Sequence, residues 1–121
     1  MDTPTTAVEL LADESKWTTG AFARNADGVT RNARHDDSVC WCIQGAVNKI
    51  YDPDNLGEKK NKNLAEVTKR ILRFIKENYD PPNFVKPGTH ETITEWNVTL
   101  WNDWPDRTYD EVIHVLGSCA A

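Results

Sequence analysis

Two cysteines separated by a single residue, Cys40 and Cys42, are the best candidates for a catalytic group in this sequence. Apolar residues at helical spacing predict a helix over 39–51, which would place both thiols in its first turns. The free N–H groups and the dipole at a helix start lower a thiol pKa. A cysteine nucleophile also needs a base, which His35 or His90 would supply. One hypothesis is therefore a small cysteine hydrolase or transferase.

The same cysteines have a simpler interpretation. A free cysteine on an apolar helix is usually a small core residue, and Cys42, beside the apolar Ile43, fits that description. The spacing is also poor for a metal, because structural zinc usually takes cysteines separated by about two to four residues. We therefore expect no metal and no cofactor, and we favour a protein that is not an enzyme.

Tryptophan is abundant, with five in the chain, and three of them lie near the C-terminal end. Clustered tryptophan and arginine are typical of binding hot spots. The leading hypothesis is thus a non-enzymatic module that binds another protein through an aromatic and acidic loop. Its candidate binding residues are Trp96, Trp101, Asn102, Asp103, Trp104 and Arg107. Two alternatives stay open: Trp101 anchors the loop in the core, or a pocket beside Trp101–Asp103 binds a small ligand.

Charge is unevenly distributed in a chain of net charge -5. The segment 58–76 holds seven basic and two acidic residues. Its cations form one face of a predicted helix: Lys62, Lys69, Arg70, Arg73 and Lys76. This basic patch is either a solvated face or a second docking surface for an acidic partner. Nucleic acid is not expected, because the chain is acidic overall and no aromatic residue interleaves with these cations.

Several elements must position these residues. Helices are predicted over 4–14, 39–51 and 64–79, the last one capped by Asn63 and stabilised by a pair between Glu66 and Arg70. The segment from Thr92 to Trp104 is ambiguous, because its threonines favour a strand whereas apolar residues at helical spacing favour a helix. We expect a short helix to about Asn97, followed by the irregular aromatic loop.

Short local motifs predict where elements begin, turn and cross. Thr108 and Glu111 form a capping box that opens the final helix, which Gly117 would end. Asp27-Gly28 predicts a small hairpin, and Gly45-Ala46 predicts a close crossing by another element.

Together the pattern predicts one compact α+β domain over 1–121, mostly α, with about four helices and one small β-hairpin. A polar loop (52–62) and a proline-rich connector (80–88) join its parts. With 39% hydrophobic and 27% charged residues the chain is globular in composition, and no apolar run approaches the ~18 residues of a membrane span. No signal peptide is visible, and three cysteines without one favour a reducing cytoplasm.

Three motifs carry a family resemblance. They are Trp17-x-x-Gly20-Ala21-Phe22-Ala23-Arg24, Trp41-Cys42-x-x-Gly45-Ala46, and Trp101-Asn102-Asp103-x-Pro105-x-Arg107-Thr108-x-x-Glu111-Val112. Their order resembles a small family of unknown function from actinobacteria and their phages. The resemblance implies a single compact domain and no particular reaction. It is compatible with a phage or mobile-element accessory protein that acts on a host protein. The chain departs from the pattern in its polar loop, its basic third helix and the tryptophans at 96 and 104.

Overall fold

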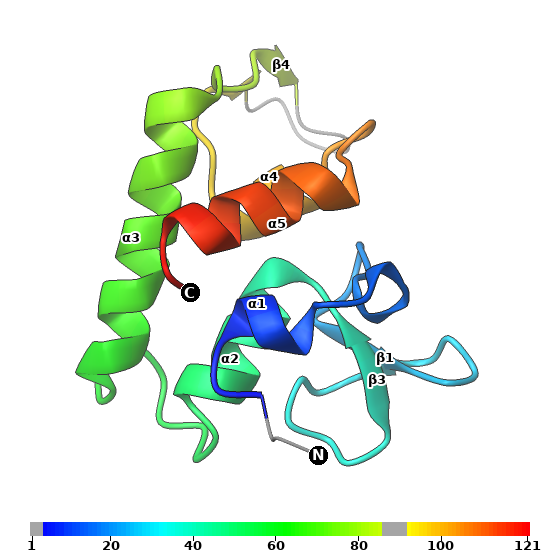
Figure 1. Ribbon diagram of the computed structural model, residues 1–121. Helices are drawn as coiled ribbons and strands as arrows, with labels where there is room; N and C mark the ends of the chain where they lie inside the picture. Colours follow the sequence, from blue (N-terminus) through cyan, green and yellow to red (C-terminus); the bar gives the residue numbers. More distant parts are fainter. Residues whose placement is uncertain (1–3, 86–91) are drawn as a thin grey trace.

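The computed structural model describes residues 4–85 and 92–121 (Figure 1). Within these ranges the fold is α+β and mostly helical, with five α-helices and a small three-stranded sheet, which confirms the predicted fold class. The elements follow in this order: α1 (Ala7–Leu10), the 3-10 helix η1 (Glu14–Lys16), β1 (Ala23–Asn25), β2 (Thr30–Arg31), β3 (Ser38–Trp41), α2 (Ile43–Tyr51), α3 (Lys62–Asn78), β4 (Phe84–Val85), β5 (Thr92–Ile93), α4 (Val98–Asn102) and α5 (Tyr109–Ser118).

The three-stranded sheet has the order β2-β1-β3, and all its pairs are antiparallel. The predicted hairpin between β1 and β2 is confirmed. Asn25 organises its turn, because its Oδ1 accepts hydrogen bonds from the backbone N–H groups of Asp27 and Val29. Gly28 has a φ of 80°, a conformation that favours glycine. The second sheet pairs β4 with β5.

The core lies between α3 and the shorter helices that pack on it. In Figure 1, α3 runs along one side of the molecule, and α2, α4 and α5 pack against it. Buried aliphatic side chains from these helices fill the interface: Ile43, Val47, Leu64, Val67, Ile71, Ile75, Val112, Val115 and Leu116. None of the helices in the described part of the chain is long and apolar enough to cross a membrane.

The close crossing predicted at Gly45-Ala46 is confirmed. A Cβ on Gly45 would lie 1.9 Å from the backbone oxygen of Phe22, in the segment that leads into β1. The same oxygen accepts a hydrogen bond from the backbone N–H of Cys42 at 3.2 Å. The glycine therefore lets the N-terminal segment lie directly on α2.

The helix predicted over 39–51 is wrong at its start. Residues Ser38–Trp41 form β3, which pairs with β1, and α2 begins only at Ile43. Burial along the strand does not alternate: Ser38 and Trp41 are buried, and exposed Val39 is the extra residue where the register with β1 shifts. Pairing with β1 overrides the helical spacing of the apolar residues, so neither cysteine lies within the helix itself.

Three other helix boundaries also differ from the prediction. The helix predicted over 4–14 is reduced to α1, because Asp13 bonds the N–H of Ser15 and starts η1 instead. The cap of α3 is Asn61, whose Oδ1 accepts from Leu64 N at 3.0 Å, and not Asn63. At the chain's end, α5 continues through Gly117 to Ser118.

The segment that begins at Thr92 differs from the prediction of a helix followed by a loop. Residues Thr92–Ile93 are a strand, and the helix follows as α4. Asn97, predicted to end a helix, begins one, since its Oδ1 accepts a hydrogen bond from the N–H of Leu100 at 2.7 Å. The capping box of Thr108 and Glu111 on α5 is confirmed. Part of the connector 80–88 lies outside the described residues.

Candidate functional site

Most of the predicted binding loop is core. Trp101 and Asn102 are fully buried, Trp96 is 6% exposed, and the Arg107 side chain is 7% exposed. Asp103 and Trp104 are half-buried. The burial of Trp101 fits the alternative in which this residue anchors the loop in the core.

Asn102 makes four side-chain hydrogen bonds, three of which join α4 to two other segments. Its Oδ1 accepts from Trp17 Nε1 at 2.8 Å and from the backbone N–H of Ile43 at 3.1 Å. Its Nδ2 donates to the backbone oxygen of Thr18 at 3.2 Å and to Asp103 Oδ1 at 2.8 Å. The Trp-Asn-Asp motif thereby fastens the N-terminal segment and the start of α2 to α4.

Arg107 is held just as firmly. Its Nε donates to the backbone oxygen of Trp101 at 2.8 Å, and its Nη1 pairs with Glu111 at 2.9 Å. The guanidinium lies 3.9 Å from the Trp101 ring centre, and further out it faces the rings of Tyr79 and Trp96. This residue positions the surrounding aromatic rings.

Of these tryptophans, Trp104 is the most exposed, and its ring packs on the buried ring of Trp96. Trp96 and Trp104 pack edge to face with their centres 5.0 Å apart. Each of them lines a separate cleft. We name these the Lys76 cleft, lined by Lys76, Tyr79, Pro81, Thr94, Glu95 and Trp96, and the Trp104 cleft, lined by Asn83, Trp104, Pro105 and Asp106.

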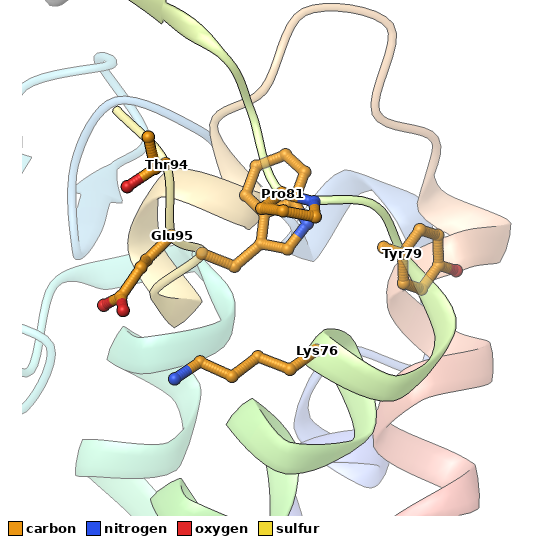
Figure 2. Close-up of a pocket in the computed structure, with 6 residues that line it drawn as sticks. Lys76, Tyr79, Pro81, Thr94 and Glu95 are labelled. Carbon is orange, nitrogen blue, oxygen red and sulfur yellow. The ribbon is translucent and has the colours of Figure 1, made fainter. Parts of the chain in front are cut away.

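The Lys76 cleft lies where the C-terminal end of α3 meets the segment before α4 (Figure 2). Its volume is about 190 Å³. Figure 2 shows the Lys76 side chain extending below the cleft, with the Glu95 carboxylate on the same side. Burial, followed by the charge of Glu111, raises the pKa of Tyr79, so its phenol is neutral at physiological pH.

The Trp104 cleft is larger and more open, with a volume of about 510 Å³. Pro105 and Asp106 form its rim, and Asp106 has a positive φ of 71°. The turn is closed by a hydrogen bond from the backbone N–H of Arg107 to the oxygen of Trp104 at 3.0 Å. An aromatic ring, a proline and a carboxylate are thus presented together.

The predicted basic patch is exposed along its whole length. Lys62, Lys69, Arg70, Arg73 and Lys76 all project from α3 into solvent. Arg70 also donates to the backbone oxygen of Cys119 at 2.7 Å, and the predicted ion pair with Glu66 does not form. A surface groove of about 440 Å³ runs among these cations, lined by Lys69, Leu72, Arg73, Lys76 and Glu77.

The cysteines lie in surroundings unlike those of an activated nucleophile. Cys42 is 1% exposed, and its Sγ accepts from the backbone N–H of Gly45 at 3.3 Å. Burial raises the pKa of the Cys42 thiol to about 11, whereas a helix start was expected to lower it. Cys40 lies in β3, half-buried.

Within the described part of the chain, no hydrogen bond links a histidine proposed as a base to a cysteine. His35 is exposed, and its Nδ1 accepts from the backbone N–H of Asp37 at 3.2 Å. His90 lies outside the described residues. Over residues 4–85 and 92–121, no group of three or more His, Cys, Asp or Glu side chains could hold a metal ion.

A third cleft lies beside the Trp101–Asp103 stretch, as the small-ligand hypothesis required. It has a volume of about 290 Å³ and is lined by Gly20, Ala21, Phe22, Thr30, Thr99 and Asp103. Its carboxylate is already engaged, because Asp103 Oδ1 accepts from Gly20 N at 3.0 Å and from Asn102 Nδ2. This cleft offers fewer free polar groups than the Lys76 cleft.

Sequence reasoning missed seven of the residues that line the two clefts beside the tryptophan pair: Tyr79, Pro81, Asn83, Thr94, Glu95, Pro105 and Asp106. A signal was present in the prolines that follow α3, since a proline-containing segment next to clustered tryptophan is typical of a rigid, apolar surface. The contact between α3 and the segment before α4 joins residues far apart in the sequence, so spacing alone could not show it.

A model of a protein family matches residues 2–121, almost the whole chain. The chain belongs to DUF6197, a family of unknown function. No curated protein and no solved structure matches the chain significantly. Membership of DUF6197 therefore identifies the chain's relatives without supplying a reaction or a ligand.

Proposed function

We propose that this protein is a protein-interaction module that binds a segment of a partner protein at the Lys76 cleft and the Trp104 cleft. The observation that carries the proposal is the arrangement of Trp96 and Trp104, packed edge to face, each lining one of two adjacent clefts. Two clefts separated by one pair of rings suit a peptide that places one side chain in each cleft, on either side of the two rings.

The size and rigidity of the surface support a peptide ligand. The Lys76 cleft, at about 190 Å³, is smaller than the roughly 300–1,000 Å³ typical of small-molecule sites, but it accommodates one side chain. The Trp104 cleft, at about 510 Å³, lies within that range, and three of its four lining residues, Asn83, Pro105 and Asp106, are exposed. Pro81 and Pro105 stiffen the walls, and Arg107 fixes Trp96 and Tyr79 from behind. A preformed site of this kind loses little conformational entropy on binding.

We also propose where the module acts. Three free cysteines, two of them buried, favour a reducing cytoplasm. The proposed setting is that of a phage or mobile-element accessory protein acting on a host protein. Its support is the resemblance of the three motifs and the small, acidic chain.

A surface-displayed library of random peptides tests the proposal. We expect enrichment of peptides that bind the wild-type protein and lose binding to Trp104→Ala and to Asn83→Arg, which fills the Trp104 cleft from its exposed edge. Asn63→Arg makes the same chemical change on an exposed position of α3, and should bind as the wild type does. Circular dichroism verifies that all variants are folded. Peptides that bind all four proteins equally, or no enriched peptides, would contradict the proposal.

A further inference from the structure

The exposed cations of α3 and the Lys76 cleft form one continuous surface. Lys69, Arg73 and Lys76 line the groove on α3, and Lys76 also lines the cleft beyond it. We name this surface the α3 tract: Lys69, Leu72, Arg73, Lys76 and the Lys76 cleft. It combines a row of positive charges with an apolar cleft at one end.

The groove of the α3 tract carries three cations against one carboxylate, Glu77. Among the described residues, Lys69, Arg73 and Lys76 form no ion pair. Their spacing along the helix, four and then three residues, places like charges side by side, which destabilises a helix by about 0.2–0.5 kcal/mol per pair. A chain with net charge -5 thus keeps an unfavourable cluster of cations on one exposed face. This arrangement complements an anionic ligand.

The Lys76 cleft at the end of the tract favours an uncharged side chain, unlike the cations of α3, which favour anionic groups. Tyr79, Pro81 and Trp96 give it apolar walls, while Glu95 disfavours a second carboxylate there. A ligand that fits both parts has acidic residues over α3 and an uncharged, apolar side chain in the Lys76 cleft. Half-buried Leu72 offers a further apolar contact between the cations.

From these observations we infer that the partner segment is an acidic peptide that carries an apolar or aromatic anchor residue. The inference rests on the proposed function and names the partner's chemistry. Nucleic acid matches the tract less well. The groove that holds Lys69, Arg73 and Lys76 is lined by no aromatic ring, so a base has no stacking platform beside these cations.

Fluorescence anisotropy with labelled synthetic probes tests this inference on the full chain. The probes are a peptide of repeated glutamates ending in phenylalanine, the same peptide ending in serine, a repeated-lysine peptide ending in phenylalanine, and single-stranded oligothymidylate. We expect the acidic peptide with phenylalanine to bind most tightly and to weaken as salt concentration rises. Replacing its phenylalanine by serine should cost about tenfold in affinity.

Variants of the protein localise the binding. The double variant Lys69→Glu, Arg73→Glu should lose about tenfold or more in affinity for the acidic peptide. The matched control Lys59→Glu, Lys60→Glu makes the same change of charge in the exposed loop before α3, and should lose much less. Thr94→Trp, on the exposed rim of the Lys76 cleft, should abolish the preference for phenylalanine over serine.

Equal losses in the two double variants would overturn the inference, since binding would then follow net charge alone. Tighter binding of oligothymidylate or of the lysine peptide would overturn it as well. The proposed function has a separate criterion. If the displayed library yields peptides that depend on Trp104 but are not acidic, the module binds peptides and only the inferred partner chemistry is wrong.

Discussion

At the scale of single residues, the Trp-Asn-Asp motif has its effect through a buried amide. Asn102 uses both polar atoms of its side chain, and the two groups that donate to its Oδ1, Trp17 Nε1 and the Ile43 N–H, come from segments distant in the sequence. A buried donor left without a partner costs about 1–3 kcal/mol. The motif therefore has a structural role, because it holds α4 to the N-terminal segment and to the start of α2.

Asn102→Ala should lower the free energy of unfolding by about 3 kcal/mol, because it leaves both donors unpaired in the interior. Urea unfolding followed by tryptophan fluorescence measures this change. Asn63→Ala, on an exposed position of α3, is the control and should stay within about 0.5 kcal/mol of the wild type. A loss below about 1 kcal/mol for Asn102→Ala would show that water replaces the amide.

Cys42 supports a second prediction at this scale. With its pKa raised to about 11 from a usual value near 9, the thiolate fraction at neutral pH is about a hundredfold lower. Iodoacetamide should leave Cys42 of the native protein unmodified over a time in which the unfolded protein is fully labelled. Peptide mapping by mass spectrometry gives the modified positions. Labelling of native Cys42 at the unfolded rate would revive the cysteine-enzyme hypothesis.

At the scale of elements, the crossing of the Phe22 segment over α2 depends on the missing side chain of Gly45. Ala at this position would bring Cβ within 1.9 Å of a backbone oxygen, so the two elements must separate. We expect Gly45→Ala to destabilise the protein by roughly 3 kcal/mol, the upper part of the range for overpacking. Urea unfolding provides the measurement.

Gly117 supplies a matched control in another helix. Nothing lies within 4 Å of a Cβ placed there, and the residue lies inside α5. Gly117→Ala should therefore stabilise the protein by about 0.5–1 kcal/mol, the usual gain of alanine over glycine in a helix. If both substitutions changed stability in the same direction, the crossing at Gly45 would not be as close as the structure shows.

Elements with strong local signals were predictable from the sequence, and those set by distant contacts were not. The capping box at Thr108 and the Asp27-Gly28 turn depend on neighbouring residues, so both were found. Strand β3 depends on pairing with β1, which the helical spacing of Val39 and Ile43 concealed. The candidate site shows the same division. The basic face of α3 follows from periodicity, whereas the clefts depend on how Trp96 and Tyr79 meet in space.

At the scale of the whole molecule, charge is separated between a cationic α3 and an acidic remainder. The segment 58–76 carries seven of the 14 lysines and arginines of the chain. Such a distribution steers an acidic ligand toward α3 while the rest of the surface repels it. Asp52, a buried carboxylate, lies in the connection between α2 and the cationic α3.

Asp52 connects several segments through its side chain, which is 1% exposed. It pairs with Arg34 at 3.0 Å and accepts from the N–H groups of Leu56 and Gly57, both at 2.9 Å, and from Asn61 Nδ2 at 3.1 Å. Burial alone would raise the pKa of Asp52. The hydrogen bonds from Gly57, Leu56 and Asn61, together with the charge of Arg34, outweigh that effect and lower its pKa below 3.8.

This lowered pKa predicts how the stability of the whole fold depends on pH. The ionised Asp52 stabilises the folded protein fully above the pKa of the unfolded chain, about 3.9, and that contribution is lost as pH falls through the lower folded pKa. The difference in free energy of unfolding between wild type and Asp52→Asn should thus be constant from about pH 5 to 7. It should shrink steadily below about pH 4. Urea unfolding across this range measures it, with exposed Asp54→Asn as the control. A difference that stays constant down to about pH 2 would mean that the carboxylate charge does not hold this junction together.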